Sequence, residues 1–504
     1  MRVATESGTI RTPWACPGEP LNLGAPDSMI PISPKPAMPS LWTRSVIAAT
    51  GLVAASLVQA QTPAASTILA MSGSRNPDGM VLGPDGALYG ASATSSTSSG
   101  ALFYRVTVDG SSVDTLYQFR PADGLGPAGA LVLGSDNLFY GTTQFSNGGV
   151  ASGGGTVFRV APDGTGFTVL HEFAPSTSDN VNSNPVNSQG NAPHGALIEG
   201  SDDGFLYGAA RFGGPNGAGT IFKVGKDGSG FAVLWSFAEI TSAAGATIIN
   251  TDGAHPRAGL VESAGYFYGT TNTGGANGLG TIFRLRFDGS EFSVLHVFTA
   301  ATGSPATNED GALPEAGLTD GGDGLLYGTA TAGGANGLGV LYSITPDGSV
   351  RTTLHDFTAA DGSKPIGTLL LGSDGRLYGT ANDGGTTSSG DASTLGTVYS
   401  IDPLAPPSTG FTKLYNFESA TGANPSGRLV QLNATEFVGT TNNGGRCGNG
   451  TVFRLSLAGT TVTGDTSCGE SSNSGGGGGA ISWLSLLMLA TLLPLGASHR
   501  RAAS

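Results

Sequence analysis

The sequence predicts an all-β fold, namely a seven-bladed β-propeller built of four-stranded antiparallel blades. Two observations predict it: a motif of the type LYGTT recurs seven times, and a similar succession of short β-rich runs and turns follows each copy. Repeats of this length indicate stacked or radial units. The copies are at Tyr89-Gly90, Tyr140-Gly141, Tyr207-Gly208, Tyr268-Gly269, Tyr327-Gly328, Tyr378-Gly379 and, in a diverged form, Val438-Gly439.

The fourth repeat shows the order of the expected strands. An apolar run over residues 258–262 precedes a run over 266–271; a glycine-rich loop leads to residues 281–287, and a turn leads to residues 292–298. Four such runs form an antiparallel meander. No segment keeps a 3.6-residue apolar period over helical length, which excludes helical repeats. A β-solenoid is the alternative fold, but solenoid rungs are usually shorter than these units.

A four-stranded meander cannot bury both of its faces by itself, so the repeats are expected to pack side by side around an axis. The segment from Ser66 to Leu69 resembles the last strand of a repeat, although it lies near the start of the chain. We expect it to complete the seventh blade beside residues 451–455, which gives a propeller over residues 66–465.

The N-terminal segment predicts export. Residues 38–60 combine Arg44, an apolar run too short to be a good membrane span, and a small-x-small cleavage signal. We therefore expect a signal peptide that signal peptidase cuts between Ala60 and Gln61. Residues 1–37 have neither a core pattern nor a targeting pattern, and we interpret them as a mis-assigned start or a disordered segment.

The C-terminal segment has three parts. Residues 466–479 are a Gly/Ser-rich linker, and residues 480–504 hold an apolar stretch with a basic end that should stay in the cytoplasm. This order resembles the GlyGly-CTERM sorting signal. The resemblance implies cleavage near Gly475 and Gly476 by a rhomboid-type protease, after transient anchoring in the inner membrane, and a final place at the cell surface or outside the cell. A plain membrane anchor is the alternative.

The repeats resemble the GloVer tandem repeats of choice-of-anchor proteins. The shared pattern is LYGTT, a GG-x-G-x-GT loop that enters an apolar strand, and a following strand of the type vLh-F. The first repeat lacks the glycine pair, and the last lacks the tyrosine. The resemblance covers nearly the whole mature chain and implies the fold, but no activity. The matching glycine pairs are Gly213-Gly214, Gly274-Gly275, Gly333-Gly334, Gly384-Gly385 and Gly444-Gly445.

Charge and cysteine content exclude several classes of function. Lys and Arg number 23 against 37 Asp and Glu, a formal net charge of -14, so the chain has no basic footprint for nucleic acid. The histidines are dispersed and no CxxC motif is present, so we expect no metal; no catalytic motif or cofactor motif is found either. Cys447 and Cys468 are expected to form a disulfide that contributes roughly 3 kcal/mol.

Three recurring features have structural explanations. Asp-Gly pairs lack the ligand spacing of a calcium loop and lie where hairpin turns are expected. The glycine-rich loops lead into strands, whereas a phosphate loop leads into a helix. One aromatic position in the last strand of the repeats accepts several ring types, which favours packing between blades over metal binding. This position holds Tyr117, His171, Trp235, His296, His355 and Tyr415.

The candidate binding face follows from strand direction. In a four-stranded antiparallel blade, the loop between the second and third strands and the crossover to the next blade emerge at one end of the ring. Loops on a rigid scaffold often bind ligands, and Asn side chains offer donors and acceptors to a sugar. Tight turn geometry is the alternative explanation for these residues. The candidates are Asn147, Asn216, Asn272, Asn277, Asn336, Asn382 and Asn442.

We therefore expect a non-catalytic binding module for a glycan, a peptide or an envelope protein. The alternatives are an extracellular polysaccharide hydrolase or lyase on a propeller scaffold, and a structural envelope protein or adhesin. Several His, Arg, Asp or Glu side chains converging in one pocket would favour the enzyme. A shallow ring of Asn, Thr and Gly would favour the binding module.

Processing at both ends is testable by intact-mass measurement of the exported protein. We expect a mature chain that begins at Gln61 and has lost its tail after the glycine run. Retention of residues 480–504 would contradict the sorting signal and leave a simple anchor.

Overall fold

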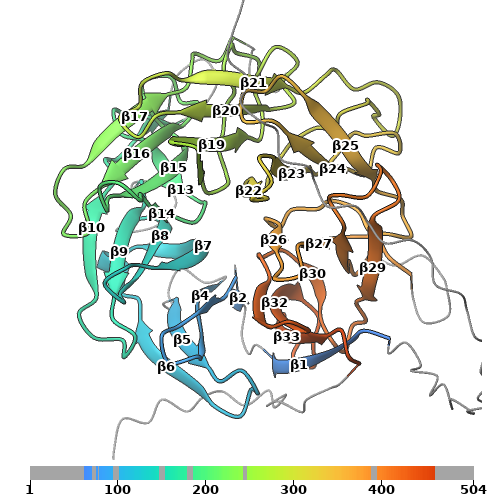
Figure 1. Cartoon of the computed structure of the whole chain (residues 1–504). Coiled ribbons are helices and arrows are strands. Elements are labelled where there is room, and N and C mark those ends of the chain that lie inside the picture. The colour runs from blue at the N-terminus through green and yellow to red at the C-terminus, as the bar shows by residue number, and fades with distance from the viewer. Residues whose placement is uncertain are drawn as a thin grey trace, which may run out of the picture. The chain divides into compact units, whose positions relative to one another are not determined.

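Each repeat folds into one antiparallel sheet, and seven sheets stand around a central axis (Figure 1). The computed structural model describes residues 62–70, 75–77, 79–94, 101–146, 154–178, 185–241, 247–386 and 394–459. Within these residues the only helical element is a short 3-10 turn, η1 (Pro121–Asp123). The predicted seven-bladed propeller is therefore confirmed.

The strands of each blade follow one another from the axis outward. Blade 1 holds β2 (Arg75–Pro77), β3 (Val81–Leu82), β4 (Leu88–Thr94), β5 (Leu102–Val106) and β6 (Val113–Gln118); blade 2 holds β7 (Leu125–Leu133), β8 (Phe139–Phe145), β9 (Thr156–Val160) and β10 (Thr168–Glu172). Blade 3 holds β13 (Asn191–Pro193), β14 (Ile198–Glu199), β15 (Leu206–Phe212), β16 (Thr220–Val224) and β17 (Ala232–Ser236); blade 4 holds β18 (Val261–Ser263), β19 (Tyr266–Thr271), β20 (Thr281–Leu285) and β21 (Ser293–Val297). Between blades 2 and 3 the chain forms a small ladder of β11 (Thr177–Ser178) and β12 (Pro185–Val186).

The remaining three blades repeat the pattern. Blade 5 holds β22 (Thr319–Asp320), β23 (Leu326–Ala330), β24 (Val340–Ile344) and β25 (Arg351–Asp356); blade 6 holds β26 (Leu370–Leu371), β27 (Leu377–Ala381), β28 (Thr397–Ile401) and β29 (Phe411–Asn416). Blade 7 holds β30 (Ala423–Pro425), β31 (Val430–Asn433), β32 (Glu436–Asn443), β33 (Thr451–Ser456) and, from the start of the chain, β1 (Ala64–Ala70).

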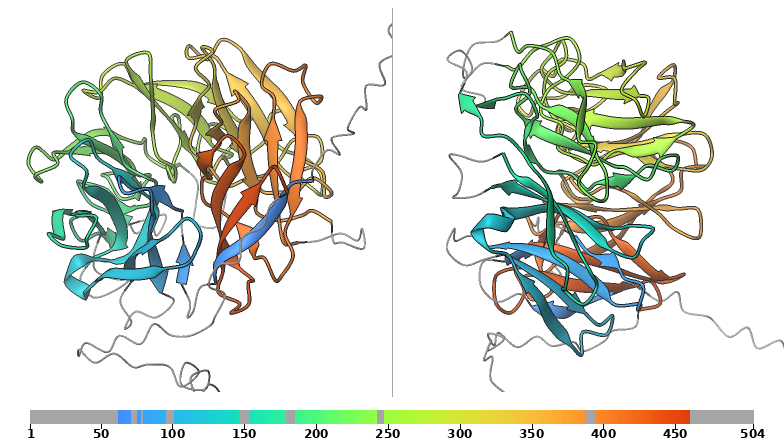
Figure 2. Two further views of the ribbon diagram at one scale, coloured as in Figure 1. Left: turned by 60° about the horizontal axis from the view of Figure 1, so that its bottom comes forward. Right: turned by 90° about the vertical axis from the view of Figure 1, so that its left-hand side faces the viewer.

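The ring closes through β1. This strand pairs antiparallel with β33, from Ala64 opposite Ser456 to Ala70 opposite Thr451 (Figure 2). Ile68 and Leu69 of β1 pack into a core cluster that includes Leu88 of blade 1 and Val452 of blade 7. The expectation that Ser66 to Leu69 completes the seventh blade beside residues 451–455 is confirmed, because Ser66 lies opposite Arg454 and Leu69 opposite Val452.

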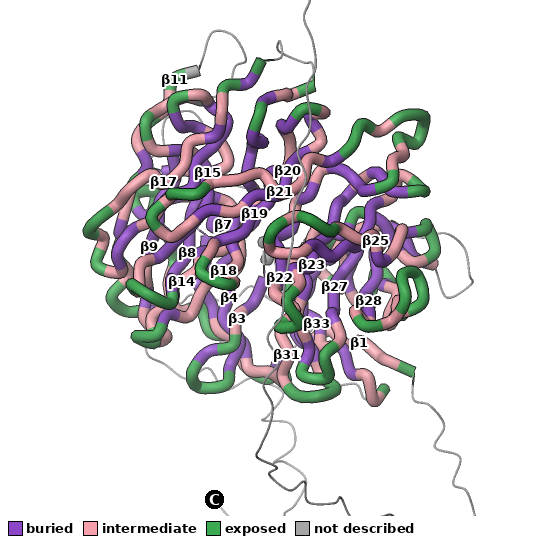
Figure 3. Tube along the Cα trace, turned by 45° about the horizontal axis from the view of Figure 1, so that its top comes forward, coloured by how far each residue is buried: buried purple, intermediate pink, exposed green. Residues whose placement is uncertain are grey.

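The tyrosine and glycine of the repeated LYG motif build the core of six blades, and Val438 replaces the tyrosine in blade 7. The tyrosine is buried, and in five blades the hydroxyl donates to the aspartate of the first hairpin, as from Tyr140 to Asp136 at 2.6 Å and from Tyr207 to Asp203 at 2.8 Å. The glycine that follows leaves room for a ring: a Cβ on Gly269 would lie 2.5 Å from Phe283 of the next strand. The second and third strands are accordingly the most buried (Figure 3).

The aromatic position of the last strand packs between blades, as predicted. Trp235 of blade 3 stacks on Phe292 of blade 4 with ring centroids 3.9 Å apart and planes within 1°. Its Nε1 donates to Asp252 in the crossover at 3.1 Å. The position requires a flat ring with one polar atom at its edge, which explains why Trp, Tyr and His all occur there. Parallel stacks join Tyr117 to Phe167, His171 to Phe231 and His355 to Phe411.

A glycine and a proline hold neighbouring blades together at the end of the ring where the chain passes to the next blade. Gly280, just before β20, has a φ of +95°, and a Cβ there would lie 2.3 Å from the carbonyl oxygen of Thr271 and 2.7 Å from Cδ of Pro314 in the next crossover. The same contact recurs between Gly219 and Pro256. The backbone N–H before each proline also donates to the preceding blade, as from Leu313 to Leu279 at 2.8 Å.

This contact predicts the effect of an alanine at Gly280. Gly280→Ala combines a left-handed backbone with overpacking, so we expect the free energy of unfolding to fall by about 3–4 kcal/mol. Gly375→Ala is the matched control, because Gly375 has a φ of +81° and a Cβ added there would meet nothing within 4 Å; its loss should be about 1 kcal/mol. Equal losses in urea denaturation would contradict the contact.

Candidate functional site

The two ends of the ring differ in their loops. At one end, here called the crossover end, lie the loops between second and third strands and the passages to the next blade. The other end, the hairpin end, carries the two hairpins of each blade. Six of the seven candidate asparagines are within the described residues, and all six belong to the crossover end.

Three of the asparagines hold loops in place. The side-chain amides of Asn216, Asn277 and Asn336 each donate to the backbone carbonyl of the phenylalanine that follows the fourth strand of the same blade, at 2.8, 2.8 and 3.0 Å. These amide N–H groups therefore close the loop against the blade. A role of these residues in binding a ligand stays a prediction.

The other asparagines lie where the second strand ends, closer to the axis. The amide of Asn382 donates to the carbonyl of Pro425 at 3.1 Å, and Asn442 accepts from the hydroxyl of Ser426 at 2.9 Å. Nδ2 of Asn272 is buried without a hydrogen-bond partner among the described residues. Asn147 lies outside the described residues.

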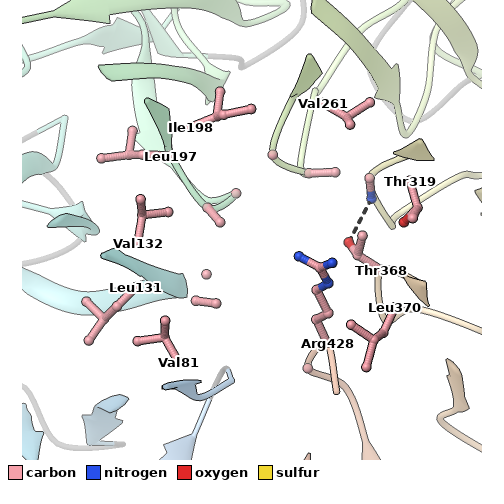
Figure 4. A pocket seen from close by; sticks show the side chains of 18 of the residues that line it. Val81, Leu131, Val132, Leu197, Ile198, Val261, Thr319, Thr368, Leu370 and Arg428 are labelled. Carbon is pink, nitrogen blue, oxygen red and sulfur yellow. Dashed lines mark hydrogen bonds between the residues drawn. The ribbon is translucent and has the colours of Figure 1, made fainter. Parts of the chain in front are cut away.

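A cavity of about 900 Å³ occupies the centre of the ring and is lined by the innermost segments of all seven blades. Its wall is largely aliphatic, with Val81, Val132, Ile198, Val261 and Leu370 facing the space (Figure 4). Alternate residues of the same segments, such as Leu131 and Leu197, are buried in the blades. At this level the side chains alternate as in a β-strand, so that Val132 and Ile198 face the cavity where Leu131 and Leu197 face the core.

Arg428 of blade 7 extends into this cavity (Figure 4). Within the described part of the chain it has neither a hydrogen bond nor an ion pair. The side chain is accessible to solvent. The surrounding blades nevertheless displace part of the water around the guanidinium, and this desolvation lowers the pKa of Arg428 from its usual value. Five blades place Ala130, Ala196, Gly259, Gly317 and Thr368 at the same register position, so Arg428 is the one large side chain at this level.

Charged and polar side chains from three consecutive blades meet at the mouth of the cavity on the crossover end. His194, Arg257 and Glu315 occupy equivalent positions of blades 3, 4 and 5, and all three line the cavity. Nη1 of Arg257 lies 2.9 Å from Oε2 of Glu315, in an ion pair whose side chains are 24% and 29% exposed. This ion pair fixes two of the three side chains relative to each other.

Two further side chains stand behind this mouth. His255 is buried, its Nδ1 lies 2.9 Å from the hydroxyl of Thr273, and its ring meets Phe212 edge-on at 4.9 Å. The guanidinium of Arg211 lies over the same Phe212 ring, at 4.5 Å from its centroid. Burial, together with the charge of Arg257, lowers the pKa of Arg211 to about 10.

The histidines of this group are neutral at physiological pH. Burial lowers the pKa of His194 to about 4, and the charges of Arg257 and Arg211 act in the same direction. Burial also lowers the pKa of His255 to about 4, again with both arginines contributing. Desolvation and like charge both disfavour the imidazolium form.

The cavity residues were not among the candidates found by sequence reasoning. Those candidates were loop asparagines, whereas His194, Arg257, Glu315 and Arg428 lie in the segments just before the LYG motif. A signal was present: when the repeats are aligned on the proline that opens these segments, blades 3 to 5 have ionisable residues at the next position, as does blade 1 with Asp78, which lies outside the described residues. Blades 2, 6 and 7 have Ala128, Ile366 and Ser426 there.

Several expectations fall partly or wholly outside the described residues. Cys447 is disulfide-bonded, but Cys468 is outside them, as are Ala60, Gln61, Gly475 and Gly476. Among the residues that are described, no group of three or more His, Cys, Asp or Glu could hold a metal ion. No helix in the described ranges is long and apolar enough to cross a membrane.

The lowered histidine pKa values predict a loss of stability in acid. Between about pH 4 and the ordinary histidine pKa of 6.5, the unfolded chain binds more protons than the folded protein. The stabilisation by neutral His194 and His255 is therefore complete above pH 6.5 and is lost as the pH falls toward 4.

The double variant His194→Ser/His255→Asn tests this, because Ser426 and Asn424 occupy these positions in blade 7. Urea denaturation at several pH values should show a smaller loss of stability in acid for the variant than for the wild type. Carboxylates titrate in both proteins and cancel in the comparison. Parallel pH profiles would show that the histidines are not responsible.

Three comparisons place the chain among known proteins. The profile of the Gloeobacter/Verrucomicrobia repeat matches residues 55–250 and 242–391. No curated protein sequence matches. Many solved structures are similar in fold, among them a catalytically inactive virginiamycin B lyase from Staphylococcus aureus with quinupristin, at 15% identity, a TM-score of 0.47, and coverage of 78% of this chain and 99% of that one.

Two other similar structures are enzymes as well. The GH74 xyloglucanase from Xanthomonas campestris has 14% identity, a TM-score of 0.48, and coverage of 75% of this chain and 52% of that one. The periplasmic gluconolactonase PpgL from Pseudomonas aeruginosa has 18% identity, a TM-score of 0.42, and coverage of 74% and 96%. Similarities this low carry no inference about what this chain binds.

The family match is of a different kind, because it covers more than half of the chain and the repeats themselves. It agrees with the resemblance carried by the LYGTT motif and the glycine pairs. The chain belongs to the Gloeobacter/Verrucomicrobia repeat family.

Proposed function

We propose that this protein is an exported, non-catalytic binding module whose ligand enters the central cavity from the crossover end. The observation that carries the proposal is the meeting of His194, Arg257 and Glu315 at the mouth of a cavity of about 900 Å³. A cavity of this size suits a small molecule or one or two units of a polymer. Polar side chains at its mouth would fix the orientation of the ligand, and the aliphatic wall would hold its apolar parts.

The charges at the mouth favour a ligand that carries an acidic group. The protein has a formal net charge of -14, yet Arg257 and Arg428 line the cavity and Arg211 stands behind Arg257. Three carboxylates of the described residues also line the cavity, of which Glu315 is paired with Arg257 and Glu199 with Lys226. Within low-dielectric walls a guanidinium attracts an anion more strongly than it does in bulk water. Of a glycan, a peptide and an envelope protein as ligands, an acidic glycan or a carboxylate-bearing peptide segment therefore suits the site best.

A second candidate function is that of an enzyme that cleaves extracellular polysaccharide. The meeting of His, Arg and Glu in one pocket favours it. Glycoside hydrolysis commonly uses two carboxylates that flank the scissile bond, whereas Glu315 is the one carboxylate at this mouth among the described residues and is already paired with Arg257. Neutral histidines with a pKa of about 4 are also weak bases. Binding without cleavage is therefore the first proposal.

The binding proposal is tested with an array of neutral and uronate-containing oligosaccharides, followed by calorimetry on the best hit. The double variant Arg257→Ser/Glu315→Ala keeps the net charge and installs the small residues found in other blades. We expect it to weaken binding by about 10- to 100-fold, because hydrogen bonds to charged groups are worth about 1.5–3 kcal/mol. The free energy of unfolding should fall by about 1 kcal/mol or less, since the ion pair is partly exposed.

The chain offers a matched control at the hairpin end. Arg286 and Glu291 form an ion pair of 3.3 Å with side chains 44% and 56% exposed. The variant Arg286→Ala/Glu291→Ala should bind the hit as the wild type does. A hit that binds equally to all three proteins would place the ligand elsewhere, and release of shortened or unsaturated oligosaccharides by the wild type would favour the enzyme.

A further inference from the structure

We infer that the anionic ligand of the central cavity is an aliphatic monoanion rather than an acidic glycan, and that its carboxylate or sulfate ester pairs with Arg428 while its chain lies on an apolar wall. This inference rests on the proposed function, since it names the class of ligand for the same cavity. It goes further by assigning Arg428 and the wall beside it, neither of which the mouth residues involve. Three observations carry it.

The first observation is the unpaired guanidinium. Arg428 projects into the cavity, and no carboxylate among the described residues pairs with it (Figure 4). A planar guanidinium fork matches a carboxylate with two parallel hydrogen bonds. One unpaired guanidinium compensates one negative charge, which favours a monoanion over a phosphate monoester.

The second observation is that the cavity wall is divided by blade. Where the innermost segments approach the hairpin end, blades 1, 2 and 6 place Leu82, Leu133 and Leu371 on the cavity. At the same register position blades 3 and 5 place Glu199 and Asp320 there, and the carboxylate of Glu199 is paired with Lys226. Among the residues that the structure describes, the ionisable side chains at the mouth also come from blades 3 to 5. The cavity therefore has one charged wall and one apolar wall.

The third observation is where Arg428 stands. Blade 7 lies between blades 6 and 1 in the closed ring, so the apolar wall flanks Arg428 on both sides (Figure 1). The apolar wall, defined here by Val81, Leu82, Val132, Leu133, Leu370 and Leu371, continues from the level of Arg428 toward the hairpin end. Leu82 is among the few large hydrophobic side chains that are exposed in the described structure, at 36%.

A ligand with only an aliphatic chain, or with only a charged group, would fit the cavity poorly. A simple carboxylate would leave the apolar wall in contact with water, and an uncharged alcohol would leave Arg428 without an anion. A molecule with both parts buries apolar surface and pairs the guanidinium at the same time, so the two contributions add.

The test uses octanoate, octyl sulfate, octanol and acetate as probes, with calorimetry on the folded wild-type protein. We expect octanoate and octyl sulfate to bind at least about 10-fold more tightly than octanol or acetate, which corresponds to one charge-assisted hydrogen-bond pair. Octanol binding as tightly as octanoate would overturn the inference. So would an absence of octanoate binding.

Variants separate the two parts of the site. Arg428→Ala should weaken octanoate by about 10- to 100-fold and leave octanol unchanged, and Arg428→Lys should recover part of the loss. Leu370→Thr copies Thr319 of blade 5 and should weaken octanoate and octanol alike. Arg286→Ala, at the hairpin end, removes the same charge and should change nothing. Equal octanoate affinity in wild type and Arg428→Ala would overturn the assignment of Arg428.

The results also distinguish this inference from the function on which it rests. If an oligosaccharide binds and loses affinity in Arg257→Ser/Glu315→Ala while octanoate does not bind, the cavity is the site but its ligand is not an aliphatic monoanion. If octanoate binds and no oligosaccharide displaces it, the aliphatic monoanion is supported as the ligand of the cavity and the acidic glycan is not. If neither probe binds the wild type, both proposals fail.

Discussion

The pairing of β1 with β33 is the contact on which the rest of this structure depends. A blade buries both of its faces only when it has a neighbour on each side, and blades 1 and 7 become neighbours only when the start of the chain returns to its end. Closing so long a loop costs entropy that grows only logarithmically with its length. The backbone ladder of β1 and the burial of Ile68 and Leu69 beside blades 1 and 7 offset that cost.

In the closed ring the motif residues make contacts that every blade needs, whereas the residues that line the cavity vary from blade to blade. The LYG tyrosine bonds to a hairpin aspartate, its glycine admits a ring, and Gly280 and its equivalents receive the proline of the next crossover. None of these side chains reaches the axis. The blades differ along the segments that line the cavity: Arg257 and Glu315 stand where Ile366 and Ser426 stand elsewhere.

This division explains which sequence-based expectations succeeded. The stacking of Trp235 on Phe292 could be expected, because a position that accepts Trp, Tyr and His must select a flat ring with a polar edge. The asparagine loops were a weaker guide to function. Asn216, Asn277 and Asn336 recur because each amide closes its own loop against a phenylalanine carbonyl, so their repetition reflects a repeated turn.

The sequence by itself determined the class of fold and the number of blades, because periodic motifs and turn residues act locally and recur in every repeat. The pairing of β1 with β33 was an expectation that the tertiary structure confirmed. Only the tertiary structure decided where the chemistry gathers. His194, Arg257 and Glu315 are about 60 residues apart in sequence, and Arg428 is more distant still. They share one cavity because the ring brings equivalent positions of different blades to the same axis, a relation that appears in no single stretch of sequence.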